Sequence, residues 1–348
     1  MSGFSRRQFG LMATAAASAA AMSACAAPSQ PAGSSDTPAP PSAPTHNLNP
    51  VKQINAGDLS IGYTDAGPTD GRPVILLHGW PYDIHSYADV SAALADRGFR
   101  VIVPYLRGFG STRFLTNAAV RNGQQAALAH DVTALMDALN IPQAILGGFD
   151  WGGRSANVVA ALWPQRVSGL VAVSGYIIVN LTTNLQPLPP KAELAWWYQY
   201  YFATPRGELG YRQNTKAFNR LIWESASPLW HFTDAAYDLT AGAFDNPDHV
   251  AIVVHNYRWR LSLANGESRY DSDEQRLAAK PAITVPTITI ASDFDGSAKD
   301  GVGYRALYAG PYQHRVLDGI GHNVPQEAPQ PFADAVVEVS RMSSHQPR

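Results

Sequence analysis

The sequence predicts an α/β protein, in which short β-strands alternate with helices. Short runs rich in aliphatic and β-branched residues recur along the chain, and segments of helical length separate them. The strand-length runs are continuously apolar, which is typical of parallel strands that are buried on both faces of a sheet. We therefore expect a mostly parallel sheet with helices on both faces.

The first half of the folded region is predicted to contain five strands, at residues 59–63, 74–77, 100–104, 143–146 and 169–173. Helix-length stretches lie between them, at residues 87–97, 124–139 and 153–162. After this point, residues 180–275 carry helical patterns and many aromatics without a comparable strand run. The strands resume at residues 284–291 and 315–317. One α/β domain with a helical insertion explains this order better than two tandem domains.

The composition excludes several classes of protein. Of the 348 residues, 45% are hydrophobic and 16% are charged, so the chain can bury a large core. The formal net charge of −2 provides no basic face for nucleic acid. The single cysteine excludes a disulfide framework and a thiolate zinc site. We expect no metal and no cofactor, and we expect a small molecule as the partner.

The first 26 residues have the three regions of an export signal. Arg6 and Arg7 precede an Ala-rich stretch that runs to Met22, and small residues around Cys25 offer a cleavage site. The arginine pair resembles a twin-arginine signal. We expect residues 1–26 to direct export to the periplasm or the medium. In the alternative interpretation, Cys25 carries a lipid that anchors the mature chain to a membrane.

Residues 27–50 contain seven prolines, with Ser, Ala, Thr and Gly between them. This composition cannot bury a core, so we expect a disordered linker. Folding is expected to begin at Val51. The α/β core would then comprise residues 51–179 and 276–339, followed by a short tail at residues 340–348.

The pentapeptide Gly-Phe-Asp-Trp-Gly at residues 148–152 carries the first chemical signal. It lies between the strand that ends at Leu146 and the helix expected to begin at Gly153. Glycines around one reactive residue at a strand-to-helix turn are typical of a nucleophile elbow, in which a sharp turn exposes a side chain over the sheet edge. Asp150 is therefore the predicted nucleophile. Its alternative role is that of a helix N-cap.

The sequence His-Gly-Trp-Pro at residues 78–81 ends an earlier strand. Its loop can direct the N–H of Trp80 to the same point as the N–H of Trp151, and such a pair of donors stabilises an oxyanion. We expect His78, Trp80 and Trp151 to form the substrate-binding and oxyanion side of the site.

A histidine and an acid follow in the order that elbow enzymes use. His322 lies on a Gly-rich loop after the last strand, and the strand at residues 284–291 ends in Ser-Asp-Phe-Asp-Gly. Either Asp293 or Asp295 can therefore orient the histidine. The order nucleophile, acid, histidine is that of the α/β elbow hydrolases.

On these residues the sequence resembles the α/β-hydrolase superfamily and, within it, the epoxide hydrolases. Residues 78–81 look like that family's H-G-x-P loop, residues 150–153 match its D-W-G-G elbow, and His322 sits as its catalytic histidine does. The resemblance covers roughly residues 52–339. It implies an α/β-hydrolase fold with an eight-stranded sheet and a helical cap, which residues 180–275 would form.

An aspartate nucleophile indicates an alkyl electrophile as substrate. A carboxylate is ionised at pH 7 and can displace a leaving group from sp³ carbon, which leaves an ester on the enzyme. His322 would then activate water against this ester. Asp295 fits the family's acid position better than Asp293 does. The resemblance thus implies an exported hydrolase that opens epoxides to diols through an alkyl ester of Asp150.

Opening an epoxide also needs an acid, which the resemblance assigns to two cap tyrosines. Residues 197–205 resemble the first tyrosine segment, with Tyr198 at the donor position and Tyr200 or Tyr201 as alternatives. In the second segment, Tyr257 comes immediately before an arginine.

Two other functions stay open. A halide leaves as a weak base and needs only N–H donors, so a haloalkane or haloacid dehalogenase is the alternative enzyme. Fluoroacetate-type dehalogenases place arginine directly after the nucleophile and again three residues later, where this chain has Trp151 and Arg154. Arg154 is either a surface or ion-pair residue or a ligand of a polar or carboxylated substrate. The third possibility is a catalytically inactive hydrolase fold that binds a ligand.

Overall fold

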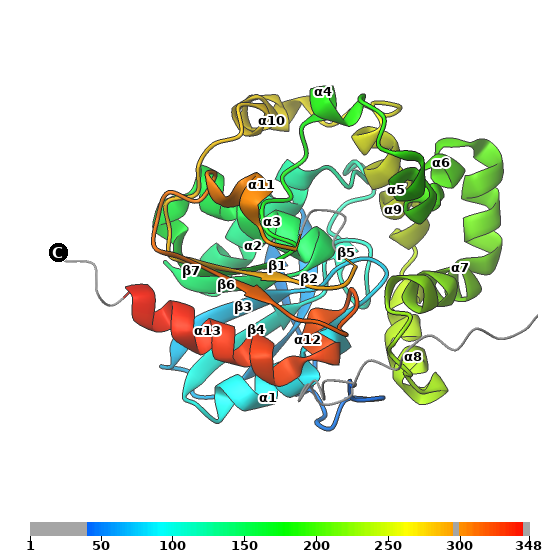
Figure 1. Cartoon of the computed structure of the whole chain (residues 1–348). Helices are drawn as coiled ribbons and strands as arrows, with labels where there is room; N and C mark the ends of the chain where they lie inside the picture. The colour runs from blue at the N-terminus through cyan, green and yellow to red at the C-terminus, as the bar shows by residue number, and fades with distance from the viewer. Residues whose placement is uncertain (1–39, 295–298, 344–348) are drawn as a thin grey trace, which may run out of the picture. The chain divides into compact units, whose positions relative to one another are not determined.

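The computed structural model describes residues 40–294 and 299–343 (Figure 1). Its sheet has the strand order β1-β2-β4-β3-β6-β7-β8-β9, and β5 pairs with β2. The bounds are β1 Lys52–Ala56, β2 Leu59–Ala66, β3 Arg72–Leu77, β4 Phe99–Pro104, β5 Arg113–Phe114, β6 Ala144–Gly148, β7 Val167–Val173, β8 Thr287–Ala291 and β9 Tyr312–Val316. This order contains eight strands, the number that the resemblance implies, but β1 is not among the strands expected from the sequence, and the two-residue β5 is a further addition.

Strands β3, β4, β6, β7, β8 and β9 run parallel, whereas β2 pairs antiparallel with β1, β4 and β5. The predicted mostly parallel α/β fold is therefore confirmed. Every residue of β6 and β8 is buried, as are the last four of β3. The buried stretches of β3 and β6 lack polar side chains because helices cover both faces of the sheet.

Two pairs of helices cover the sheet from opposite sides (Figure 1). On one side α1 packs against α13 and β4, and on the other α2 packs against α3, which also contacts β6 and β7. The helices outside the insertion are α1 Ala88–Ala95, α2 Gln125–Ala138, α3 Asp150–Leu162, α11 Val302–Arg305, α12 Val324–Glu327 and α13 Pro329–Ser343, with 3-10 turns η1 Ile84–Tyr87 and η2 Pro164–Arg166. Helix α13 therefore extends into the tail that was expected to begin at residue 340, because its apolar face stays against the sheet through buried Val339.

All residues between β7 and β8 are described, and they form the predicted helical cap without any strand. Its helices are α4 Leu181–Asn184, α5 Pro190–Ala195, α6 Trp197–Ala203, α7 Pro205–Ala226, α8 Asp234–Ala241, α9 His249–Arg260 and α10 Asp271–Ala278, with 3-10 turns η3 Gly242–Asp245 and η4 Ser268–Tyr270. Helices α6, α7 and α9 pack against one another. Their shared core consists mainly of aromatic side chains.

Residues 40–50 correct the prediction of a disordered linker over residues 27–50. The carbonyl of Pro41 accepts a hydrogen bond from the Trp230 indole at 2.6 Å, and the Asp89 carboxylate accepts from the backbone N–H of Thr45 at 2.9 Å and of His46 at 2.8 Å. The composition of this segment does not reveal these bonds, because its backbone carbonyl and N–H groups form them and its side chains do not. The rest of the linker, the export signal and Cys25 lie outside the described residues. None of the helices in the described ranges is both long and apolar enough to cross a bilayer.

Candidate active site

Asp150 lies at the junction of β6 and α3, in the conformation that a nucleophile elbow requires. Its φ of 49° is in the left-handed region, which non-glycine residues rarely adopt. A Cβ on Gly152 would lie 1.9 Å from the carbonyl oxygen of Leu77, so only glycine fits there. Helix α3 begins at Asp150 and not at Gly153 as expected, because the turn is tight enough for the nucleophile itself to start the helix.

The two carboxylate oxygens of Asp150 have different neighbours. The backbone N–H of Trp80 donates to Oδ1 at 2.8 Å, and Nε2 of His322 lies 3.6 Å from Oδ2. Burial raises the pKa of Asp150, but His322, Arg154 and the Trp80 N–H together outweigh burial and lower this pKa below its ordinary value. Asp150 is therefore ionised at neutral pH, and its Oδ2 has no backbone donor in the described structure.

The loop of His322 is held by two residues that the sequence analysis missed. The N–H of His322 donates to the hydroxyl of Ser227, at the end of cap helix α7, at 3.0 Å. This hydroxyl in turn donates to the Glu327 carboxylate at 2.7 Å. The same carboxylate also accepts hydrogen bonds from the N–H groups of Gly321 and Asn323. Burial raises the pKa of Glu327. In the sequence, Glu327 ends the short helix α12 between His322 and the final helix, and no motif there signals its contacts.

The acid of the triad is not assigned by geometry. Asp295 lies outside the described residues. Asp293 forms an ion pair with Lys299 and accepts a hydrogen bond from the N–H of Gly319 at 2.9 Å. Both of its carboxylate oxygens therefore have partners other than His322.

The cap brings Tyr198 and Tyr257 together above Asp150. Their rings meet edge to face at 5.2 Å, and both rings contact Trp80. Burial, aided by the charge of Asp150, raises the pKa of Tyr198 to about 12, and burial raises that of Tyr257 well above its ordinary value. Both phenols therefore keep their protons at neutral pH. The Tyr257 hydroxyl is buried beside the Tyr198 hydroxyl and the Trp151 indole.

The two alternatives to Tyr198 point elsewhere. Tyr200 is exposed and its hydroxyl bonds to Glu193, while Tyr201 stacks on Phe218. Tyr198 is thus the tyrosine of this segment that lines the cavity with Asp150.

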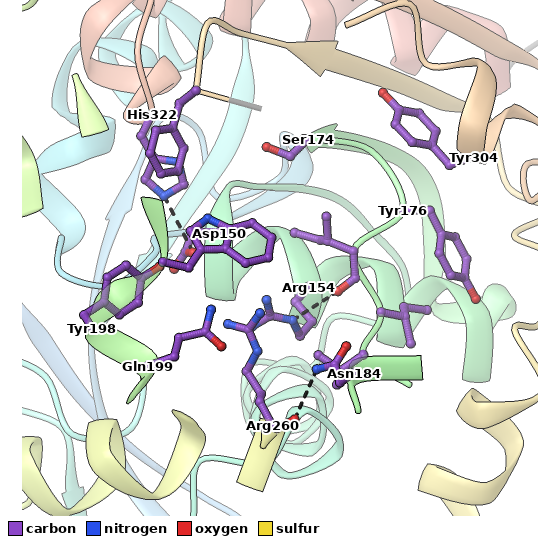
Figure 2. A pocket seen from close by; sticks show the side chains of 15 residues that line it. Asp150, Arg154, Ser174, Tyr176, Asn184, Tyr198, Gln199, Arg260, Tyr304 and His322 are labelled. Carbon is purple, nitrogen blue, oxygen red and sulfur yellow. Dashed lines mark hydrogen bonds and ion pairs between the residues drawn. The ribbon is translucent and has the colours of Figure 1, made fainter. Parts of the chain in front are cut away.

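A cavity of about 270 Å³ opens at Asp150 (Figure 2). Its wall combines core residues with residues of the cap: Asp150, Arg154, Ser174, Tyr176, Ile177, Ile178, Val179, Asn184, Trp196, Tyr198, Gln199, Arg260, Phe294, Tyr304 and His322. A second chamber of about 120 Å³ shares Asp150, Tyr198, Phe294 and His322 with it, and Trp80, Trp197 and Ile222 give it an apolar wall. Asp150 therefore lies where two chambers meet.

The structure corrects the expected role of His78. This side chain is fully buried, its Nδ1 donates to the carbonyl of Gly79, and its Nε2 accepts from the N–H of Leu106 at 3.1 Å. Burial lowers its pKa to about 4. His78 thus shapes the loop that presents Trp80 and does not line the cavity. Trp151 is also fully buried, and its indole interacts with the Tyr257 hydroxyl.

Arg154 lies on α3, one helical turn after the nucleophile, and lines the cavity. It is 7% exposed, and its Nε donates to the carbonyl of Ile177 at 3.1 Å. The sequence analysis missed Arg260, which reaches the same cavity from the end of α9. Its distance from Asp150 in the sequence gives no signal of this approach. The described ranges contain no group of three or more His, Cys, Asp or Glu side chains that could hold a metal ion.

Comparison with known proteins adds three findings. A family model described as the alpha/beta hydrolase fold matches residues 72–325. Epoxide hydrolase B of Mycobacterium tuberculosis is 34% identical over 157 residues, which are 41% of this chain and 43% of that protein. A haloalkane dehalogenase of Mycolicibacterium paratuberculosis is 31% identical over 153 residues, 43% of this chain and 48% of that protein. The chain thus spans less than half the length of these two relatives.

A solved structure is similar over a much larger part of the chain. It is the crystal structure of a proposed epoxide hydrolase from Klebsiella pneumoniae, with 61% sequence identity and a TM-score of 0.82. The match covers 84% of this chain and 97% of that one.

Proposed function

Because this chain belongs to the α/β hydrolase fold family, we propose that it is an epoxide hydrolase that works through a covalent ester of Asp150. The observation that carries the proposal is the position of Tyr198, a protonated phenol that shares a cavity with an ionised carboxylate. An epoxide opens when a nucleophile attacks its carbon while an acid protonates its oxygen. The two walls of the cavity supply these two groups.

In the first step, Oδ2 of Asp150 attacks one carbon of the epoxide and the C–O bond of the ring breaks. The released oxygen takes the proton of Tyr198 or Tyr257 and becomes the first hydroxyl of the product. Oδ2 is the attacking oxygen because Oδ1 is held by the Trp80 N–H. The product of this step is an alkyl ester of Asp150 and a tyrosinate.

In the second step, His322 takes a proton from water as the water oxygen adds to the ester carbonyl carbon. The N–H of Trp80 stabilises the negative charge on Oδ1, and we assign the backbone N–H of Trp151 as the second donor. Collapse releases the diol, whose alkoxide takes the proton from His322. The proton left on the Asp150 carboxyl returns to the tyrosinate, which restores the enzyme.

A single-turnover experiment in ¹⁸O-water tests this mechanism. With enzyme in excess over the epoxide, the first diol should contain no ¹⁸O, and the peptide that contains Asp150 should gain one ¹⁸O. A first-turnover diol that carries solvent oxygen, together with an unlabelled Asp150 peptide, would disprove the covalent route.

A dehalogenase is the second candidate, and the similarity to a haloalkane dehalogenase of Mycolicibacterium paratuberculosis favours it. A halide that leaves from carbon needs an N–H donor, and the candidate is the Trp151 indole, which in this structure interacts with the Tyr257 hydroxyl. In this case haloalkanes or haloacids should release halide, every epoxide in a broad panel should stay intact, and Trp151→Phe should slow halide release. Hydrolysis of epoxides without halide release would eliminate this candidate.

We further propose that residues 1–26 export the chain through a twin-arginine route. The Arg6→Lys, Arg7→Lys double variant should stay in the cytoplasm with its full mass, while the natural sequence should yield a shorter protein outside the cytoplasm. A lipid on Cys25 would instead appear as an acyl-bearing N-terminal peptide in the membrane fraction. Equal export of both sequences would contradict the twin-arginine route.

A further inference from the structure

Two arginines face the cavity beside the nucleophile, one from the core and one from the cap. Figure 2 shows Arg154 of α3 and Arg260 of α9 pointing toward the same part of the cavity, with Gln199 beside them. The two guanidinium groups are close enough for the charge of Arg260 to add to burial in lowering the pKa of Arg154 to about 10. The two guanidinium charges repel each other in this buried site, and an anion bound between them would relieve the repulsion.

Neither arginine has an acidic partner within ion-pair distance among the described residues. Arg154 donates its Nε to a carbonyl, and Nε of Arg260 is buried without a partner. Arg107 provides the contrast within the same chain, since it is also buried but forms a two-point ion pair with Asp131 at 2.6 and 2.7 Å. The chain thus neutralises a buried arginine elsewhere and leaves this pair open to the cavity.

The charges of the cavity wall do not balance. Among the described residues that line it, Asp150 is the one carboxylate, and it faces two guanidinium groups. Its carboxylate must stay free to attack carbon, so it cannot serve as the permanent partner of either arginine. One positive charge is therefore left for a bound anion.

Resting on the epoxide hydrolase function proposed above, we propose that Arg154 and Arg260 bind a carboxylate of the substrate, so that the enzyme acts on epoxides that carry an acid group. The planar fork of a guanidinium matches a carboxylate through paired N–H···O bonds. The acid group would occupy the larger chamber and the reacting carbon would lie at Asp150. The apolar chamber lined by Trp80 and Ile222 would then receive the other substituent of the epoxide.

The test compares an epoxy carboxylic acid with its methyl ester, which has the same skeleton without the charge. The natural enzyme should hydrolyse the acid with the higher kcat/KM. Arg260→Met should lower kcat/KM for the acid about 10- to 100-fold, as expected for loss of a charge-assisted hydrogen bond, and should change that for the ester less than about 3-fold. Arg154→Met should act in the same direction. Arg212→Met is the matched control, because Arg212 pairs with Glu208 on the surface and should leave both substrates unaffected.

A binding measurement separates failure of this proposal from failure of the proposed function. Phenylacetate, an acid that cannot react, should raise the Tm of Asp150→Asn enzyme, and the additional Arg260→Met substitution should abolish the rise. If no epoxide is hydrolysed but phenylacetate still stabilises the protein through Arg260, the function is wrong and the anion site stands. Equal kcat/KM for acid and ester in the natural enzyme, or equal losses for both in Arg260→Met, would overturn the anion site.

Discussion

The core wall and the cap wall of the cavity are held in place by different kinds of contact. On the core wall, backbone geometry positions the reacting groups: Asp150 has a left-handed conformation, the N–H of Trp80 holds its Oδ1, and a buried Glu327 holds the loop of His322. On the cap wall, Tyr198 and Tyr257 are held mainly by packing against aromatic rings.

This difference follows from what each wall must do. Attack on carbon requires the nucleophile within a few tenths of an ångström of its place, which short backbone contacts can enforce. A proton donor tolerates a softer position, and aromatic packing lets the cap accept differently shaped substrates. Substitutions on the core wall should therefore abolish activity, while those on the cap wall should lower kcat by degrees.

The largest expected effect is that of Asp150→Asn. An amide cannot form the ester, so kcat should fall about 10⁴-fold or more. Asparagine tolerates the left-handed conformation, so the elbow should keep its shape. Steady-state kinetics together with Tm checks this, and the expected result is loss of turnover at a nearly unchanged Tm. Turnover that stays within about 10-fold of the natural enzyme would remove Asp150 from the mechanism.

Acid should destabilise the fold through two buried histidines, one in the α/β core and one in the cap. Burial lowers the pKa of His78 and of His249 to about 4, below their ordinary value of 6.5. The unfolded chain therefore binds two protons that the folded chain does not, and the free energy of unfolding falls as the pH drops from about 6.5 to about 4. Each histidine accounts for about 3 kcal/mol once the pH is below this range.

Thermal unfolding from pH 7 to pH 4 measures this effect. His249→Gln should be less stable at pH 7, because its bonds to the Gly108 carbonyl and the Tyr211 hydroxyl are lost, but its Tm should fall less steeply with acid. Parallel curves for the two proteins would show that His249 does not contribute to the pH dependence.

Removing one phenol from the cap wall should give an intermediate effect. Tyr257→Phe and Tyr198→Phe should each lower kcat for epoxides about 10- to 100-fold, because the remaining tyrosine still donates a proton. Each Tm should change little, since the rings and their packing remain. The double variant should lose almost all activity on epoxides. If neither single variant affects the reaction, the acid comes from another group and the cap wall only shapes the cavity.

The difference between backbone contacts on the core wall and aromatic packing on the cap wall also explains how well each wall could be predicted from the sequence. Glycines and short motifs mark tight backbone turns, so Asp150, Trp80 and His322 were recognisable from residues 148–152, 78–81 and the last loop. Arg260 was missed because its approach to Arg154 depends on how the cap folds back over the core. His78 was misassigned because the motif identifies the loop but not the direction in which its side chain points.

The elements of the fold also divide into those that the sequence predicts and those that it does not. Strands β3, β6 and β7 were predicted because burial on both faces makes them continuously apolar. Strand β1 was missed because it lies at the edge of the sheet with mostly exposed side chains. Residues 40–50 were misread as disordered because their composition is dominated by proline and polar residues, although Leu48 packs against the core and their carbonyl and N–H groups find partners. Composition therefore predicted what hydrophobic burial decides and failed where backbone hydrogen bonds decide.

The smallest expected effect tests whether the two walls are independent. Ser227 belongs to the cap, yet its hydroxyl joins the N–H of His322 to the carboxylate of Glu327. Ser227→Ala leaves both of these buried groups short of one partner, which should cost about 1–3 kcal/mol of stability. In the proposed mechanism the ester is hydrolysed through His322, so the second step should slow while formation of the ester does not.

Rapid-quench kinetics can separate the two steps, and Ser227→Ala should accumulate more of the Asp150 ester than the natural enzyme does. Thr215→Ala is the control, since it removes a hydroxyl of the same helix α7 whose one hydrogen bond among the described residues is to the Tyr211 carbonyl, and it should leave the ester level unchanged. If Ser227→Ala lowers Tm without raising the ester level, the cap stabilises the histidine loop but does not affect the reaction. A raised ester level would instead mean that the cap wall, through one hydroxyl, takes part in positioning the base of the core wall.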